Sequence, residues 1–231
     1  MSSPYGLAVD ASGNLFIADL GNHRVRRVAR DGTITTVASA APDGSALVTP
    51  RNVALDPVGN LYIADFDANR VYRVTPAGTV TLVAGTGSSG YTGDGGLAVQ
   101  AQLDHPAGLA TDRMGGLYIG DTQNHVVRKV VGGVIRTLTA APAPTDLATD
   151  TLGTLYVPDA WGGAVLRIPA SGDAPSDQHG GAYGDAGQDK RTARERWAGR
   201  PPHHGNAERR DRGPRQSVAR RWGACHRGTA E

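Results

Sequence analysis

The sequence has 231 residues, 39% of them hydrophobic, and a formal net charge of +2 at pH 7. Its single cysteine, Cys225, excludes a disulfide within the chain and leaves the redox compartment open. No apolar run approaches the ~20 residues that a membrane-spanning helix needs, so we expect no membrane span.

The composition changes sharply near residue 171. All Leu, Ile, Phe and Met residues lie in 1–171, which carries a net charge of −2, whereas 172–231 carries +4. A segment without these side chains cannot bury enough apolar area to offset the entropy of ordering. We therefore predict a folded domain over 1–171 and a disordered, basic, low-complexity tail over 172–231. A native tail and a shifted reading frame in a GC-rich gene both fit this composition.

The first unit of the chain runs from Pro4 to about Ala38 and predicts four short strands. Apolar and polar residues alternate in its third segment, and its last segment is rich in β-branched residues. Tight turns with Gly13 and Gly32 separate the segments. The expected strands are Tyr5–Val9, Leu15–Ala18, Arg24–Val28 and Thr33–Val37.

This unit recurs three times, at about 51–84, 107–139 and 145–171. The stretch Gly59–Asp65, a turn glycine followed by an apolar strand and an aspartate, returns in every unit. Repetition of a four-stranded meander at this length, without helices, is typical of β-propeller blades. We predict an all-β propeller of about four antiparallel blades, the last incomplete because only three strands are expected in it.

Two sets of aspartates repeat with the units. Those in the Asp-x-x-Gly turns can accept hydrogen bonds from nearby backbone amides, which indicates a structural role; they are Asp10, Asp56, Asp112 and Asp150. Those after each second strand could form a ring that holds a cation, but their presence in every blade favours loop capping; they are Asp19, Asp65, Asp121 and Asp159.

Short motifs in the loops resemble the NHL repeat family. They are Asn22-His23-Arg24-Val25, Asn124-His125-Val126-Val127 and a slipped version at Asn69-Arg70-Val71. The glycine-rich stretch Gly85–Gly96 is similar to the linker between blades of bacterial NHL proteins. The resemblance covers residues 4–171 and implies a propeller, although such propellers commonly close with six blades. An incomplete ring would expose apolar blade faces and an unpaired edge, which favours self-association.

The resemblance does not set the function, because the family includes lyases, kinase sensor domains, RNA-binding ubiquitin ligases and secreted proteins. Bacterial relatives with this linker imply an extracytoplasmic location. We nevertheless expect no signal peptide, because Pro4–Asp10 already belongs to the first repeat.

The long, variable segments all fall at one end of the predicted blades, where loops follow the second and fourth strands. Binding function concentrates on long loops over a rigid scaffold, so we expect a ligand on this end. The candidate residues are Phe66, Asp67, Tyr91, Asp94, His105, Gln123 and Trp161. His23 and His125 occupy equivalent positions in the repeat and are interpreted as hydrogen bonders between blades.

Residues 1–171 contain no glutamate, no Gly-x-Ser-x-Gly elbow and no phosphate-binding loop. We therefore predict no catalytic residue, no metal site and no cofactor. Nucleic acid is not expected as a partner, because the folded part is slightly acidic. The sequence favours a non-catalytic binding or sensor module for a protein, peptide or glycan. The alternative is a truncated, metal-dependent lyase or hydrolase of the propeller type.

Overall fold

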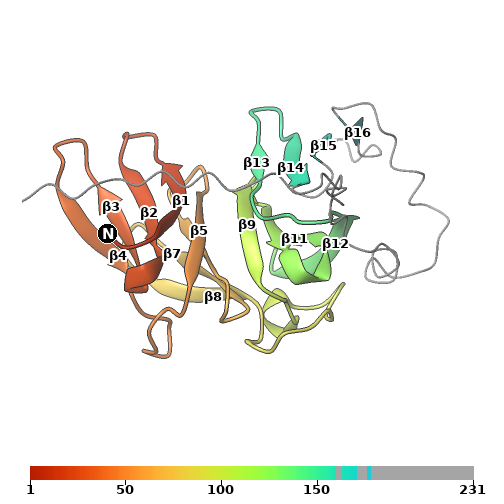
Figure 1. Ribbon diagram of the computed structural model, residues 1–231, viewed down its shortest axis with the longest axis horizontal. Helices are drawn as coiled ribbons and strands as arrows, with labels where there is room; N and C mark the ends of the chain where they lie inside the picture. Colours follow the sequence, from red (N-terminus) through yellow and green to blue (C-terminus); the bar gives the residue numbers. More distant parts are fainter. Residues whose placement is uncertain (160–162, 171–175, 178–231) are drawn as a thin grey trace, which may run out of the picture. The chain divides into compact units, whose positions relative to one another are not determined.

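The computed structural model describes residues 1–159, 163–170 and 176–177. Over this part the chain is all-β and forms four sheets, each of four strands that pair antiparallel in chain order (Figure 1). The strands are, sheet by sheet, β1 (Pro4–Val9), β2 (Leu15–Asp19), β3 (Arg24–Val28) and β4 (Ile34–Ala38); β5 (Pro50–Leu55), β6 (Leu61–Asp65), β7 (Arg70–Val74) and β8 (Val80–Ala84); β9 (Pro106–Thr111), β10 (Leu117–Asp121), β11 (Val126–Val131) and β12 (Val134–Ala140); and β13 (Ala148–Thr149), β14 (Leu155–Asp159), β15 (Ala164–Ile168) and β16 (Ser176–Asp177).

Each sheet is one blade of a propeller arrangement, and we number the blades in chain order. The predicted fold class is confirmed, and the four strands expected in the first unit match β1–β4 to within one residue. Three 3₁₀ turns lie in the connections of the described part: η1 (Leu20–Asn22), η2 (Ala98–Gln100) and η3 (Thr122–Asn124). None of the helical segments found there could span a bilayer.

Blade 4 is less complete than the others, because β13 and β16 contain two residues each. We expected it to have three strands, but the structure adds β16, which pairs with β15 through Arg167↔Ser176 and Leu166↔Asp177. Backbone pairing needs no apolar side chain, which is why composition gave no sign of this strand. The rest of the predicted tail lies outside the described residues.

The turn between the first two strands of a blade has the same construction throughout. In blade 2 the Asp56 carboxylate accepts the amides of Val58 and Asn60 at 3.1 and 2.8 Å, and Gly59 adopts a φ of +88°. Glycine tolerates this left-handed conformation because it lacks a Cβ. The same amide contacts recur at Asp10, Asp112 and Asp150, so these aspartates shape the turns as predicted.

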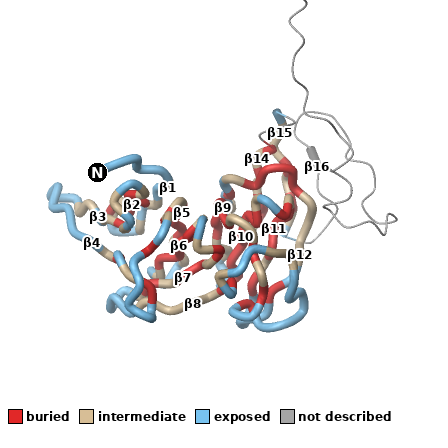
Figure 2. The backbone as a smooth tube through the Cα atoms, turned by 60° about the horizontal axis from the view of Figure 1, so that its bottom comes forward, coloured by how far each residue is buried: buried red, intermediate tan, exposed pale blue. Residues whose placement is uncertain are grey.

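Three apolar clusters join the blades in sequence. The cluster between blades 2 and 3 packs Ala54, Tyr62 and Ala64 against Leu109 and other residues of blade 3. Its counterparts join blade 1 to blade 2 and blade 3 to blade 4. Burial is therefore strongest in the middle of the series, and Figure 2 shows that β1 and β4 are largely exposed. Each blade depends on its neighbour for most of its core, as in other repeat proteins.

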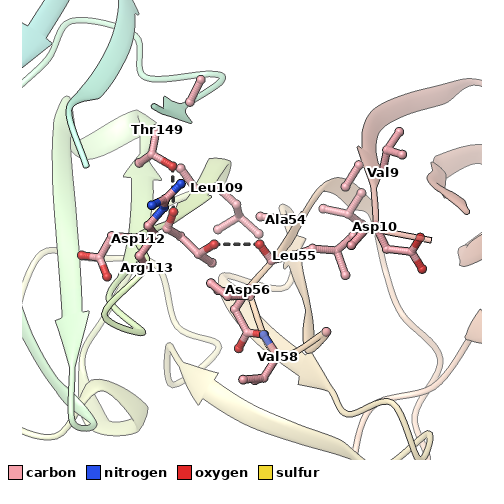
Figure 3. Close-up of a pocket in the computed structure, with 18 of the residues that line it drawn as sticks. Val9, Asp10, Ala54, Leu55, Asp56, Val58, Leu109, Asp112, Arg113 and Thr149 are labelled. Atoms are coloured by element: carbon pink, nitrogen blue, oxygen red, sulfur yellow. Dashed lines mark hydrogen bonds between the residues drawn. The ribbon is translucent and has the colours of Figure 1, made fainter. Parts of the chain in front are cut away.

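The first strands of the blades lie next to one another along the inside of the arrangement, in the order β1, β5, β9 and β13. Two side-chain bonds tie them together. The Thr111 hydroxyl donates to the carbonyl oxygen of Leu55, and the Thr149 hydroxyl donates to that of Thr111, both at 2.7 Å (Figure 3). Equivalent positions of successive blades are thus kept in register.

Candidate binding face

The long-loop face is the end of the blades that carries the loops after second strands and the linkers after fourth strands. Aspartates at the ends of second strands hold the incoming linkers there. Asp65 accepts the amides of Val48 and Thr49 at 3.0 and 2.5 Å, and Asp121 accepts the amide of Asp104 at 2.7 Å. Both carboxylates are buried, so they serve the scaffold, but the backbone amides that they accept belong to the incoming linkers and not to the loops that they were expected to cap.

The two equivalent histidines also hold linkers. His23 and His125 both adopt left-handed backbone conformations at the ends of 3₁₀ turns. Their Nδ1 atoms lie 2.5 Å from the carbonyl oxygens of Val48 and Pro142, and since a carbonyl can only accept, Nδ1 carries the proton. Each ring therefore bonds the linker that leads to the next blade.

Three of the predicted ligand residues meet on this face although they come from segments about 40 residues apart. The rings of Phe66 and His105 lie edge to face, with centroids 4.7 Å apart. The Arg51 guanidinium lies 4.3 Å from the Phe66 centroid and 4.8 Å from that of Tyr5, whose hydroxyl accepts from Arg51 at 3.2 Å. Cation–π contacts and a hydrogen bond thus fix the guanidinium between two aromatic rings.

Two carboxylates complete this group. The His105 Nδ1 atom lies 2.6 Å from Asp104 Oδ1, and its Nε2 atom lies 3.7 Å from Asp67 Oδ1. Asp67 is in turn held by the hydroxyl of Thr49. We call the set of Tyr5, Arg51, Phe66, Asp67, Asp104 and His105 the long-loop cluster.

The backbone conformation and a hydrogen bond from the backbone amide fix the position of His105. Its φ is +53°, and its amide donates to Asn69 Oδ1 of blade 2 at 2.8 Å. Pro106, which begins β9, follows directly. Blade 2 therefore determines where the histidine of the blade 3 entrance lies.

Two other predicted residues form a different group, which fastens the Gly85–His105 insertion to blade 3. Asp94 Oδ1 lies 2.6 Å from the Arg128 guanidinium, which also stands 5.2 Å from the Tyr91 centroid. Arg128 is fully buried and makes a second ion pair, at 3.3 Å, with Asp121. Burial raises the pKa of Asp121 to about 6, against the opposing effect of its hydrogen bonds and of Arg128. The sequence did not indicate that Arg128 pairs with Asp94 and Asp121, because its position in the repeat is that of an ordinary third-strand residue.

Gln123 and Trp161 are the remaining candidates. The amide of Gln123 donates to the carbonyl oxygen of Asp104 at 3.1 Å, and the side chain is exposed. Gln123 therefore adjoins the long-loop cluster through the backbone of Asp104. Trp161 lies outside the described residues.

A cavity of about 990 Å³ opens at the other end of the inner strands. It is lined by the last residues of β1, β5, β9 and β13 and by the turns that follow them (Figure 3). The side-chain amide of Asn52 donates to Asp146 Oδ1 at 3.0 Å. These two residues directly precede Val53 and Leu147, where the cavity lining begins in blades 2 and 4. This bond between blades 2 and 4 therefore lies at the long-loop end of the cavity, and nothing in the repeat predicted it.

Among the described residues, no three His, Cys, Asp or Glu side chains are grouped so as to hold a metal ion. The carboxylates around the cavity are engaged in their own turns. For example, the amide of Thr154 lowers the pKa of Asp150, and the hydrogen bonds of Asn14 lower that of Asp10.

Residues 1–28, which contain β1, β2 and β3, match the family described as NHL repeat. The chain is a β-propeller whose first blade contains an NHL repeat. The resemblance seen in the sequence is thereby confirmed, with four blades in the described part. No curated protein matches the sequence.

Several solved structures share the fold. The virginiamycin B lyase of Staphylococcus aureus matches with a TM-score of 0.56 and 20% identity, over 75% of this chain and 54% of that one. A protein of unknown function from Bacteroides thetaiotaomicron matches with 0.62 and 22% identity, over 72% and 47%. A gluconolactonase from Xanthomonas campestris matches with 0.59 and 20% identity, over 74% and 60%. The chain thus spans roughly half the length of these proteins, and the likeness shows the fold alone.

Proposed function

We propose that the chain is a non-catalytic binding module and that its long-loop cluster takes a protein or peptide ligand. The observation that supports this is the meeting of Phe66, Asp67 and His105 with Arg51 on one face. Aromatic and arginine side chains dominate the energetics of protein interfaces. A glycan, which the sequence also allows, is the other ligand class to be tested.

The cluster is organised before any ligand arrives. Arg51 is held between two rings and is bonded to Tyr5, so it has little rotamer freedom left to lose on binding. Tyr5 and Asp67 are exposed, while Phe66 and His105 are half-buried. A ligand can therefore contact aromatic and cationic groups flanked by carboxylates.

The test is a comparative capture experiment with the full chain immobilised. Partners retained by the wild type from a source extract are identified by mass spectrometry, and a glycan array is probed in parallel. Each retained partner is then purified and its Kd is measured against wild type and Phe66→Ala. We expect a protein or peptide whose affinity falls at least tenfold, since truncated hot spots cost about 2 kcal/mol or more.

The matched control for this experiment is Leu152→Ala, which truncates an exposed side chain on a tight turn at the opposite end. It should bind like the wild type. Equal affinities for Phe66→Ala and wild type would contradict the assignment of the face. Retention of glycans alone would contradict the ligand class but not the face.

A lyase or hydrolase activity is the second candidate, favoured by the geometry of His105. Its Nδ1 atom faces Asp104 at 2.6 Å, which leaves Nε2 on the side of Asp67 and solvent. A histidine oriented by a carboxylate is a common general base. Two of the similar structures are named a virginiamycin B lyase and a gluconolactonase, and one structure of the lyase contains quinupristin.

Incubation of the purified chain with quinupristin and with a sugar lactone tests this candidate. Turnover by the wild type that is lost in His105→Ala and kept in Met114→Ala, a variant on the opposite face, would replace the binding role by catalysis. Absence of turnover in the wild type would remove the candidate.

A further inference from the structure

The internal interfaces of the propeller all join the same two kinds of blade face. One kind, the aromatic face, presents Ala and an aromatic ring; the other, the aliphatic face, presents branched side chains. Between blades 1 and 2, Ala8 and Phe16 share a cluster with Val53 and Leu61. Between blades 2 and 3, Ala54 and Tyr62 share one with Leu109 and Leu117. Between blades 3 and 4, Ala110 and Tyr118 share one with Leu147 and Leu155. Each blade thus offers its aromatic face to the next blade and its aliphatic face to the one before.

Blade 1 has an aliphatic face that no other blade covers. Leu7 and Val9 of β1 are 59% and 64% exposed, and Ile34 of β4 is 45% exposed. At the position of Leu7, the other three blades have side chains that are almost completely buried; they are Val53, Leu109 and Leu147. Exposed apolar side chains that are buried at the equivalent positions of the other blades indicate an interaction surface.

Blade 4 has the matching aromatic face. Ala148 is exposed and Tyr156 is half-buried, whereas Tyr62 and Tyr118 are buried at the same position of blades 2 and 3. The Tyr156 hydroxyl donates to Asp150 Oδ2 at 3.3 Å, as the two buried tyrosines do to their own turn aspartates. The ring is therefore already held in the orientation that it needs to pack against an aliphatic face.

We propose that the aliphatic face of blade 1 binds the aromatic face of blade 4 of a second copy of this chain. One chain carries both halves of an interface that it already builds three times within itself, so a second copy supplies the same chemistry. Two different surfaces meet in such a contact, which is heterologous and gives closed rings or open filaments according to its angle. The side chains assigned to the two faces are Leu7, Val9 and Ile34 on blade 1 and Ala148 and Tyr156 on blade 4; none belongs to the long-loop cluster, so the proposal does not depend on the binding role.

Sedimentation velocity over a range of concentrations tests the proposal on the full chain. We expect the wild type to form dimers or larger species, and Leu7→Asp to remain monomeric where the wild type is half-associated. The matched control is Leu152→Asp, which places the same charge at an equally apolar but 82% exposed turn position. Circular dichroism should show the same fold for all three proteins, because both leucines are exposed.

Disulfide trapping identifies the faces directly. In a Cys225→Ala background, Leu7→Cys and Ala148→Cys chains with different tags are mixed and oxidised. We expect a mixed disulfide between the two tags, with far less product when either variant is oxidised alone. A wild type that stays monomeric at all concentrations, an equal effect of Leu152→Asp, or the absence of mixed disulfide would each overturn the proposal.

Discussion

Arg128→Met is expected to be among the most destabilising substitutions on the third strand of any blade. The guanidinium is fully buried and donates to Asp121, to Asp94 and to the carbonyl oxygen of Thr92, at 3.3, 2.6 and 3.2 Å. Methionine has a similar volume but no donor, so the substitution tests charge and hydrogen bonding with little change of packing. It leaves the buried carboxylate of Asp121 without its cation.

The expected loss of unfolding free energy depends on the hydrogen bonds that Asp121 retains in the variant. Removing one partner of a buried ion pair typically costs 3–5 kcal/mol. Asp121 still accepts the amide of Asp104 at 2.7 Å and the side chain of Asn124 at 2.9 Å. These contacts place the expected loss of unfolding free energy near the lower end, at about 3 kcal/mol. Asp94→Asn removes a partially exposed charge but keeps the chain length, and should lose only about 1 kcal/mol.

The loss should also depend on pH. The pKa of Asp121 is raised from 3.8 to about 6 in the folded protein, so the protonated carboxyl favours the folded state. This contribution to stability is complete below about pH 3.8 and is lost as the pH rises through 6. Removing Arg128 raises this native pKa further. The deficit of Arg128→Met should therefore grow between about pH 5 and pH 8, and adding Asp121→Asn should remove that growth.

Urea unfolding of the full chain, followed by circular dichroism at several pH values, measures these quantities. Arg136→Met on β12 is the matched control, since this arginine is exposed. Its stability should stay within about 0.5 kcal/mol of the wild type. A loss for Arg128→Met no larger than that for Asp94→Asn, or a deficit that is the same at every pH, would contradict the assigned role of Arg128.

Three further predictions concern the scaffold, and urea midpoints check each of them. A Cβ at Gly120 would lie 2.0 Å from the carbonyl oxygen of Pro144, so Gly120→Ala should lose about 1–3 kcal/mol. It should be less stable than Gly32→Ala, whose Cβ meets nothing within 4 Å and whose cost comes from its φ of +85° alone. Thr149→Val removes the 2.7 Å bond to Thr111 and should lose about 1 kcal/mol, with no comparable loss for the exposed Thr151→Val. Burial would raise the pKa of Asp112, but the bonds from Lys129 and Gly116 outweigh it and lower that pKa below 3.8. Asp112→Asn should therefore be less stable than the wild type near pH 7, and the difference should vanish as pH falls through the native pKa; a constant difference would contradict this assignment.

The fold could be predicted from the sequence because its determinants are local. The Asp-x-x-Gly turns, the alternation in β3 and the recurrence of Gly59–Asp65 each depend on a few neighbouring residues, and they repeat in register. The short strand β16 escaped prediction because it depends on pairing with β15 and not on its own side chains.

The long-loop face could be predicted as a region, but its contacts could not. Loop length placed Phe66, Tyr91 and His105 at the same end, without showing that they separate into two groups. Arg128 causes this separation, because its contacts with Tyr91 and Asp94 hold both residues against blade 3. Asp94 and Thr92, two of its partners, lie more than 30 residues away on an insertion that does not repeat, so no periodic pattern could indicate these contacts.

The position of the cavity was also beyond sequence reasoning. It depends on the way that four inner strands lie next to one another, and on the bond between Asn52 and Asp146, which are 94 residues apart. Residues in the inner strands follow the repeat closely, so the sequence marks them only as scaffold.

The most direct test of the central claim, that the long-loop cluster is the binding surface, is a calorimetric titration of a partner captured by the wild type. Wild type, Arg51→Ala, Phe66→Ala and Val58→Asp would be compared at one salt concentration. Val58 is a 75% exposed residue on a tight turn at the opposite end. We expect both cluster variants to bind at least tenfold more weakly, and Val58→Asp to bind like the wild type. Weakened binding in Val58→Asp with unchanged binding in the cluster variants would contradict it and move the site to the cavity.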